Sequence, residues 1–188
     1  MSLSRDFVIA AFGYWVAVEL WVIVRELGRV DRSQDRGSRF AAFVSIAVAV
    51  TVAGRIAKAT AFLLPGGTDL HLNVAAVVVL AGSSLRLWSI HTLGRFFRSA
   101  VMIQAGHRVV RSGPYRFVRH PSYSAIILNL LGVGVALGNW LALLAIIALG
   151  SAGLALRIKV EEQALAQGLG DEYVRYLRET KRVIPFLL

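Results

Sequence analysis

The sequence YSAIILNLLGVGVALGNWLALLAIIALGSAGLAL at residues 123–156 decides the fold, because it is almost wholly apolar and too long for one membrane helix. Gly138 and Asn139 lie near its middle, and this pair is typical of a tight reversal of the chain. A helix that crosses the hydrocarbon core needs about 20 mostly apolar residues. We therefore predict two membrane helices in a hairpin, at about 122–138 and 140–156. Small residues are expected to let these helices approach closely: Gly132, Gly134, Gly138, Gly150 and Gly153.

Three further apolar segments precede this hairpin. They lie at about 7–24, 40–64 and 72–93. Glu19 interrupts the first segment, and no small-residue cleavage site follows before Arg25, so we expect a retained membrane helix and not a signal peptide. The third segment carries Arg86 toward its end. The chain is therefore predicted to be an all-α integral membrane protein, a single domain over residues 1–188 with about five transmembrane helices.

Composition excludes several classes of protein and site. Of 188 residues, 56% are hydrophobic and 17% charged, and the mean hydropathy is +0.63, which fits neither a soluble domain nor a disordered chain. The chain has no cysteine, so disulfides, cysteine metal ligands and a thiol nucleophile are excluded. It also lacks a P-loop, a dinucleotide-binding glycine motif, a His-Glu-x-x-His helix and a nucleophile elbow. No metal site is expected.

Basic residues are concentrated in the loops that five helices place on one side of the membrane. Residues 25–39, 94–120 and 157–188 carry 17 Lys and Arg side chains, whereas the opposite loops carry Arg5 alone. Because basic loops stay in the cytoplasm, we predict the N-terminus outside and the C-terminus in the cytoplasm. The net charge of +10 thus indicates contact with a membrane face and no nucleic-acid partner.

The stretch GPYRFVRHPSY at residues 113–123 concentrates polar and aromatic side chains directly before the hairpin. Its two prolines stiffen the backbone, and Gly113 allows either a turn or the close approach of a ligand. Arg119 and His120 bring ionisable side chains to the same place. An interfacial turn alone requires far less, so this segment is a candidate functional site on the cytoplasmic side.

Two adjacent glutamates follow the hairpin on the same side. If the last helix continues beyond its apolar part, Glu162 lies on one stripe with Ile158, whereas Glu161 lies one turn after Arg157. Glu162 is thus predicted to face inward. Glu161 either faces the site or pairs with Arg157 or with the membrane interface.

A second amphipathic pattern follows these glutamates. Tyr173, Tyr176 and Leu177 have one-face helical spacing, and basic residues come next before Pro185 stops the pattern. We predict a C-terminal amphipathic helix that anchors on anionic lipid, caps a ligand pocket, or does both.

The second half of the chain resembles the isoprenylcysteine carboxyl methyltransferases and the related phospholipid N-methyltransferase-like membrane enzymes. The resemblance covers roughly residues 85–188. Four segments carry it in family order: LGRFF at 93–97, GHRVVRSGPYRFVRHPSY at 106–123, RIKVEEQAL at 157–165 and GDEYVRYLRETKRVIP at 170–185. It implies an enzyme that uses S-adenosylmethionine, releases S-adenosylhomocysteine and builds a cytoplasmic-face cofactor pocket from segments 94–121 and 157–185.

The resemblance also implies which residues contact the cofactor. They belong to the glycine-proline-tyrosine segment, the arginine-histidine-proline turn, the paired glutamates and the stretch where related chains enter the pocket. The expected cofactor-binding residues are Gln104, His107, Gly113, Pro114, Tyr115, His120, Pro121, Tyr123, Glu161 and Glu162. A lone histidine such as His107 is more often structural. The predicted catalytic residues are Arg119 and Glu162.

S-adenosylmethionine presents a sulfonium, an ammonium, a carboxylate and a flat adenine, which need different partners. Glutamate accepts from the ammonium or ribose, tyrosine stacks on adenine or faces the sulfonium, and arginine forks onto a carboxylate. Arg119 therefore clamps the cofactor carboxylate, positions an anionic acceptor, or anchors on lipid. In-line transfer to a carboxylate needs positioning and no base. An amine acceptor must first lose a proton, for which His120 or a glutamate is available.

The favoured function is O-methylation of a carboxylate on a lipophilic, isoprenylcysteine-like acceptor that enters from the bilayer. The alternatives are N-methylation of a phospholipid or amine, an NADPH-dependent membrane reductase of the sterol-reductase type, and a non-catalytic lipid-binding protein. Such reductases typically have asparagine before the tyrosine, where this chain has Ser122. The lipid-binding alternative explains the basic loops but not the order of the motifs. The oligomeric state stays open.

Overall fold

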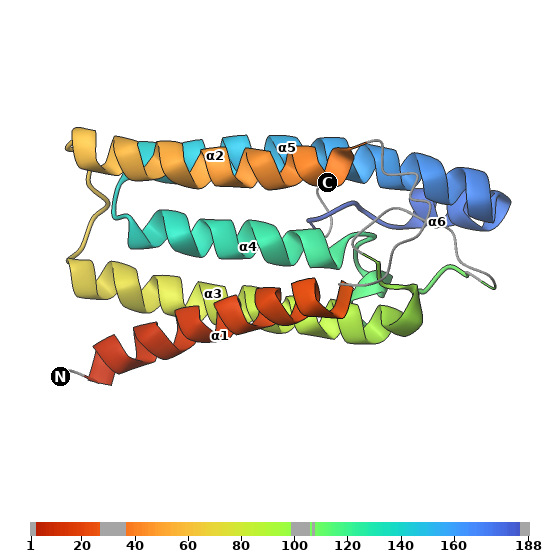
Figure 1. The fold of residues 1–188 in the computed structure, drawn as a ribbon, viewed down its shortest axis with the longest axis horizontal. Helices are drawn as coiled ribbons and strands as arrows, with labels where there is room; N and C mark the ends of the chain where they lie inside the picture. Colours follow the sequence, from red (N-terminus) through yellow and green to blue (C-terminus); the bar gives the residue numbers. More distant parts are fainter. Residues whose placement is uncertain (1–2, 27–36, 99–105, 107, 185–188) are drawn as a thin grey trace.

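The computed structural model describes residues 3–26, 37–98, 106 and 108–184, and most of these residues lie in helices (Figure 1). The elements are α1 (Leu3–Glu26), α2 (Ser38–Ala59), α3 (Thr68–Leu93), the 3-10 turns η1 (Gly94–Phe96) and η2 (Gly113–Arg116), α4 (Pro121–Ala136), α5 (Trp140–Leu169) and α6 (Asp171–Glu179). Two isolated β-bridges are the only pairing of extended backbone within these described residues. The prediction of an all-α protein is confirmed.

Four helices are long and apolar enough to cross a membrane. They are α1, α2, α3 and α5. The sequence predicts about five, and the remaining apolar segment forms α4, which has 16 residues. At a rise of 1.5 Å per residue, α4 is about 24 Å long, shorter than the roughly 30 Å of a hydrocarbon core.

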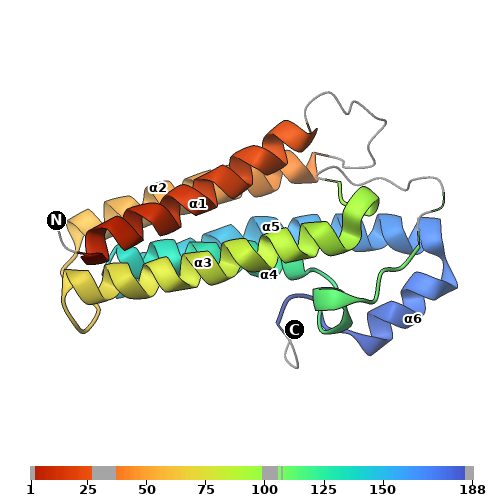
Figure 2. The same ribbon diagram turned by 90° about the horizontal axis from the view of Figure 1, so that it is seen from below.

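The long helices form two layers. In one layer α3, α4 and α5 lie side by side with α4 in the middle, and in the other α1 packs on α3 and α2 on α5 (Figures 1 and 2). Helix α5 extends past the others at one end, where α6 folds back beside it. The N-terminus of α1 lies at the opposite end.

The chain reverses between α4 and α5 at Gly138 and Asn139. Gly138 has a φ of +63°, which L-residues with a side chain rarely adopt. The Asn139 side chain accepts from Ala142 N at 3.0 Å and caps α5. It also donates to Thr60 O at 3.1 Å, so the reversal is tied to the end of α2.

Two helix ends differ from the predicted apolar segments. Helix α2 ends at Ala59 and not near residue 64, because the following backbone pairs with the α4–α5 turn, as when Leu64 N donates to Gly138 O at 2.9 Å. Helix α5 does not end at residue 156. It continues to Leu169, where Gly170 with a φ of +58° ends it.

Small residues allow close packing between helices, although not all glycines of the hairpin face each other. A Cβ on Gly134 would lie 2.6 Å from Leu143 Cδ1, so this glycine does serve the contact between α4 and α5. A Cβ on Gly153 would instead lie 2.4 Å from Ser45 Cβ of α2. The buried cluster between α2, α4 and α5 consists of Ala49, Ala53, Leu130, Ala142 and Ile146.

Candidate functional site

Two segments far apart in sequence lie side by side at the end of the bundle where α5 extends. Val118 forms a parallel bridge with Lys181. Arg119 N donates to Lys181 O at 2.7 Å, and His120 N donates to Arg182 O at 2.9 Å. The chain that follows α6 is therefore held against the turn that leads into α4, and both flank the extended part of α5.

Glu162 of α5 lies at the centre of this region and accepts from three basic side chains. Its Oε1 accepts from Arg119 Nε at 3.0 Å and lies 3.3 Å from His120 Nε2, and its Oε2 accepts from Arg182 Nε at 3.2 Å. The side chains of Arg119 and His120 are 8% and 4% exposed, whereas that of Arg182 is 58% exposed. Glu162 thus faces inward and meets two buried donors and one solvent-facing guanidinium.

Glu161 lies in a separate hydrogen-bonded chain. Tyr123 Oη donates to Glu161 Oε2 at 2.7 Å, and Arg157 Nε donates to Tyr123 Oη at 3.1 Å. The centroids of the Tyr123 and His120 rings lie 5.5 Å apart, so this series of hydrogen bonds adjoins the Glu162 cluster. Glu161 is thus linked to Arg157 through the phenol, and it lies next to the candidate site.

Arg119 also secures the end of α6. Its Nη1 donates to Leu177 O at 2.9 Å and to Thr180 O. A cation is favourable at a helix C-terminus, where carbonyl groups lack intrahelical donors. Two of the three guanidinium nitrogens of Arg119, Nε and Nη1, therefore already bond protein groups.

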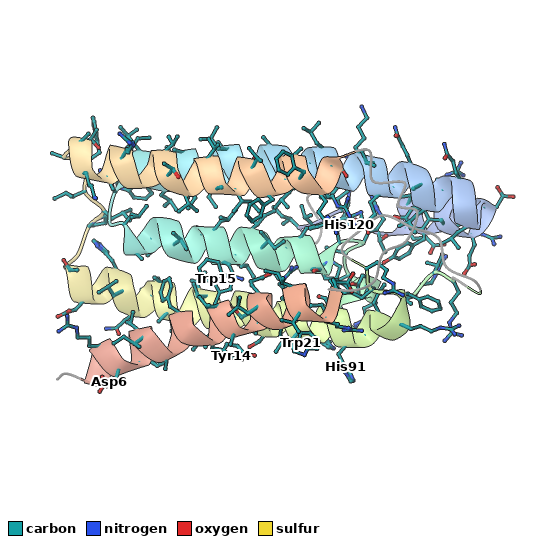
Figure 3. The ribbon with its side chains drawn as sticks, in the orientation of Figure 1. Asp6, Tyr14, Trp15, Trp21, His91 and His120 are labelled. Atoms are coloured by element: carbon teal, nitrogen blue, oxygen red, sulfur yellow. The ribbon has the colours of Figure 1, made fainter. Side chains whose placement is uncertain are left out.

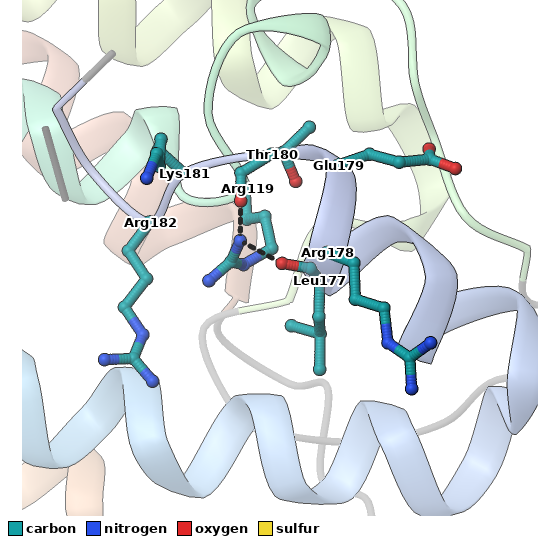
Figure 4. A pocket seen from close by; sticks show the side chains of 7 residues that line it. All are labelled: Arg119, Leu177, Arg178, Glu179, Thr180, Lys181 and Arg182. Carbon is teal, nitrogen blue, oxygen red and sulfur yellow. Dashed lines mark hydrogen bonds between the residues drawn. The ribbon is translucent and has the colours of Figure 1, made fainter. Parts of the chain in front are cut away.

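A pocket of about 280 Å³ opens beside Arg119 and the end of α6 (Figure 4). Basic side chains predominate in its lining, which is formed by Arg119, Leu177, Arg178, Glu179, Thr180, Lys181 and Arg182. In Figure 4 the Arg119 side chain is directed at the Leu177 and Thr180 backbone. The pocket is suited to an anionic group.

Buried tyrosines close the region between η2 and α6. Tyr176 Oη donates to Tyr115 O at 2.6 Å. Burial raises the pKa of Tyr176 to about 12, and burial followed by the charge of Glu161 raises the pKa of Tyr115 well above its usual value. Burial likewise raises the pKa of Tyr173, with Glu161 as the next cause. All three phenols are therefore neutral near pH 7.

The two ends of the GPYRFVRHPSY stretch have structural tasks. Gly113 has a φ of +55°, and a Cβ there would lie 2.8 Å from Thr92 Oγ1, so glycine allows η2 to pack on α3. Pro114 is the second residue of η2 and Pro121 is the first residue of α4, positions where a missing N–H costs nothing. Both prolines are buried.

The structure brings together most of the predicted site residues but not all of them can be placed. Gln104 and His107 lie outside the described residues. Arg182 and Tyr176 were not among the predicted site residues, although both belong to the amphipathic C-terminal pattern that the sequence shows. Among the residues that the structure describes, no group of three or more His, Asp or Glu side chains is placed to hold a metal ion.

The fold and the site define a helical protein with membrane-capable helices and a buried carboxylate, guanidinium and phenol cluster at one end. A family model described as the isoprenylcysteine carboxyl methyltransferase (ICMT) family matches residues 74–167. The chain belongs to this family. With its four apolar helices, it is an integral membrane protein.

Curated relatives match this chain over somewhat less than two thirds of its length. Protein-S-isoprenylcysteine O-methyltransferase B of Arabidopsis thaliana is 32% identical over 117 residues, which cover 61% of this chain and 59% of the plant protein. The protein-S-isoprenylcysteine O-methyltransferase of Saccharomyces cerevisiae is 30% identical over 122 residues, covering 64% of this chain and 51% of the yeast protein. The chain thus spans about half to three fifths of the length of these relatives.

A solved structure shares the fold over nearly the whole chain. It is that of the eukaryotic intramembrane Ras methyltransferase ICMT, with a TM-score of 0.61 and 23% sequence identity. The match covers 96% of this chain and 68% of that one. The similarity therefore includes helices α1 and α2, which lie outside the family match.

Proposed function

We propose that this chain is an S-adenosylmethionine-dependent methyltransferase that methylates a carboxylate on a lipophilic acceptor held in the bilayer. The observation that carries the proposal is the cluster around Glu162. A buried carboxylate, two buried basic side chains and one half-exposed guanidinium converge there from three separate segments of the chain. The names of the family and of its relatives support methyl transfer to an isoprenylcysteine carboxylate.

The residues of the site fit the polar end of S-adenosylmethionine, which carries both an ammonium and a carboxylate. Glu161 and Glu162 supply carboxylates for the ammonium or the ribose hydroxyls, and the basic pocket beside Arg119 suits the carboxylate. Neutral phenols such as Tyr115 and Tyr123 offer rings for the adenine or the sulfonium. The cofactor supplies a methyl group on a positively charged sulfur.

The roles that we propose for the other predicted cofactor contacts depend on the segments in which they lie. Gly113 and Pro114 hold η2, and Pro121 starts α4 next to His120, so their role is to shape the wall of the pocket. Gln104 and His107 are retained as cofactor contacts from the resemblance alone.

Arg119 and Arg182 have different roles in binding carboxylates. Arg119 is already engaged by Glu162 and by the end of α6, so we assign it the task of holding Glu162 and the cofactor-side pocket in place. Arg182 is 58% exposed and is the more accessible guanidinium for the acceptor carboxylate. The acceptor carboxylate is ionised near neutral pH. Methyl transfer to it therefore needs alignment and the exclusion of water, but no general base.

We further propose that the site faces the cytoplasm. The basic loops support this orientation, because the ends of α1, α3 and α5 that adjoin them lie at the site end of the bundle. The soluble cofactor then reaches the site from the cytoplasm, and the acceptor reaches it from the bilayer between helices.

Methyl incorporation from labelled S-adenosylmethionine tests the proposal directly. The purified protein in lipid vesicles is offered a prenylated cysteine with a free carboxylate, the matching carboxamide, and an amino phospholipid. We expect label in the free carboxylate alone, as a base-labile ester. Label in the amino phospholipid would establish N-methylation instead, and no binding of the methyl donor or its product would refute methyl transfer.

A further inference from the structure

An ion pair joins α1 to α3 within their membrane-capable lengths. Arg86 Nε lies 2.6 Å from Glu19 Oε1, and Arg86 Nη2 donates to Glu19 Oε2 at 3.0 Å. The side chains are 10% and 32% exposed. Ionisable side chains are costly inside membrane helices and usually mark functional positions. Neither residue belongs to the cluster around Glu162.

The third nitrogen of Arg86 leads to the candidate site. Arg86 Nη1 donates to Ser122 Oγ at 2.7 Å. Ser122 is buried in the first turn of α4, one residue before Tyr123 and two after His120. These two neighbours contact Glu161 and Glu162, so Arg86 grips the residue that lies between two site side chains.

A second polar contact sets the position of α1 along this face. With the Asn129 amide oxygen turned toward α1, Trp15 Nε1 donates to it at 3.0 Å, and the amide nitrogen donates to Val79 O at 3.1 Å. Trp15 lies one helical turn before Glu19, and Figure 3 shows it on α1 at mid-bundle, away from His120 at the start of α4. Sliding α1 along its axis would break both contacts, so the register of α1 is tied to α3 and α4.

We propose that Glu19 and Arg86 are positioning residues of the methyl-transfer site. The carboxylate of Glu19 orients the Arg86 guanidinium, and the guanidinium holds Ser122 so that the flanking His120 and Tyr123 side chains meet the paired glutamates. Helix α1 lies outside the 74–167 family match, so the site depends on a helix beyond the family's matched region. The effect of these residues on methyl transfer rests on the proposed function, whereas their effect on the position of Ser122 does not.

The geometry of arginine is what makes this bridge possible. A guanidinium has five N–H donors in a planar fork and can bond a carboxylate on one side and a hydroxyl on another, whereas a lysine ammonium is a point charge on a flexible stem. Arg86→Lys therefore keeps a charge for Glu19 but loses the fixed bridge to Ser122. A pair that only packs α1 on α3 would tolerate both Arg86→Lys and Ser122→Ala.

A double-mutant cycle with Glu19→Gln and Ser122→Ala tests the coupling, read out as the Kd for S-adenosylhomocysteine by calorimetry. We expect each single variant to weaken binding about tenfold and the double variant also about tenfold, because both act through one link. Ser122→Ala and Arg86→Lys retain the charge pair, so their thermal stability should change little. Asp6→Asn is the control, an exposed acid at the far end of α1 (Figure 3). The proposal would be overturned if the double variant weakened binding by the product of the two single effects. It would also be overturned if the variants lowered the thermal stability but left the Kd unchanged.

Hydrogen–deuterium exchange of the peptide that spans residues 119–124 gives a readout that needs no cofactor. Faster exchange in Glu19→Gln, Ser122→Ala and Arg86→Lys, but not in Asp6→Asn, is the expected result. If the wild type bound no S-adenosylhomocysteine, the proposed function would fail while this measurement still decided the positioning role. Unchanged exchange in Ser122→Ala and Arg86→Lys would overturn it, even if Glu19→Gln failed to fold.

Discussion

Glu162→Gln separates the charge of the central carboxylate from its shape. The amide oxygen can still accept from the two buried donors on Oε1, Arg119 Nε and His120 Nε2. A carboxylate is a stronger acceptor than a neutral amide, and a buried guanidinium without its counter-charge is unfavourable, so each of these two contacts loses about 1 kcal/mol. The contact with Arg182 adds less than about 1 kcal/mol because that guanidinium is largely exposed. We expect the free energy of unfolding to fall by about 2 kcal/mol.

The same substitution should weaken binding of S-adenosylhomocysteine about tenfold, or about 1.4 kcal/mol, since the ligand ammonium then bonds a neutral amide and loses its ionised partner. Calorimetry on the protein in detergent measures the Kd, and a thermal melt measures the stability. Glu172→Gln removes the same charge from an exposed position on α6 and serves as the control. An unchanged Kd for Glu162→Gln, or an equal loss in both variants, would refute the reasoning.

Three further predictions concern the surroundings of Glu162. Tyr123→Phe removes the hydroxyl that links the Arg157 guanidinium to the second glutamate, and we expect about a tenfold weaker Kd for S-adenosylhomocysteine by calorimetry. Gly113→Ala should lower stability by about 1–2 kcal/mol through its left-handed backbone and its close approach to Thr92, and adding Thr92→Ala should restore only part of the melting temperature. Tyr176, with its pKa raised from about 10 to about 12, stabilises the fold fully below pH 10 and loses this contribution as pH rises toward 12, which melts across that range should show.

Features that depend on periodicity along one helix could be predicted from the sequence. The stripe that contains Ile158 correctly places Glu162 inward, because a helix repeats every 3.6 residues and both positions lie in α5. The Gly138-Asn139 reversal follows from turn chemistry in the same way, with a left-handed glycine and a capping side chain. Local rules suffice where the partners lie within one or two turns of each other.

Contacts between distant segments could not be predicted in this way. Arg182 belongs to a basic run that is equally suited to lipid headgroups, and only the pairing of residues 118–120 with 181–182 brings it to Glu162. Gly153 likewise lies in the hairpin yet packs against Ser45, because its direction depends on where α2 docks. Neither outcome is encoded in spacing along one helix.

The pairing of Arg119 and His120 with the backbone of residues 181 and 182 has a consequence for biosynthesis. These residues follow α6, so they leave the ribosome after every helix of the bundle has been made. Until then the Glu162 carboxylate lacks Arg182, and Arg119 lacks the Leu177 and Thr180 carbonyls. The helices can insert as translation proceeds, but these contacts of the site form only after α6 and residues 180–182 have been made, so a chain halted shortly before residue 180 would be inserted with an incomplete site.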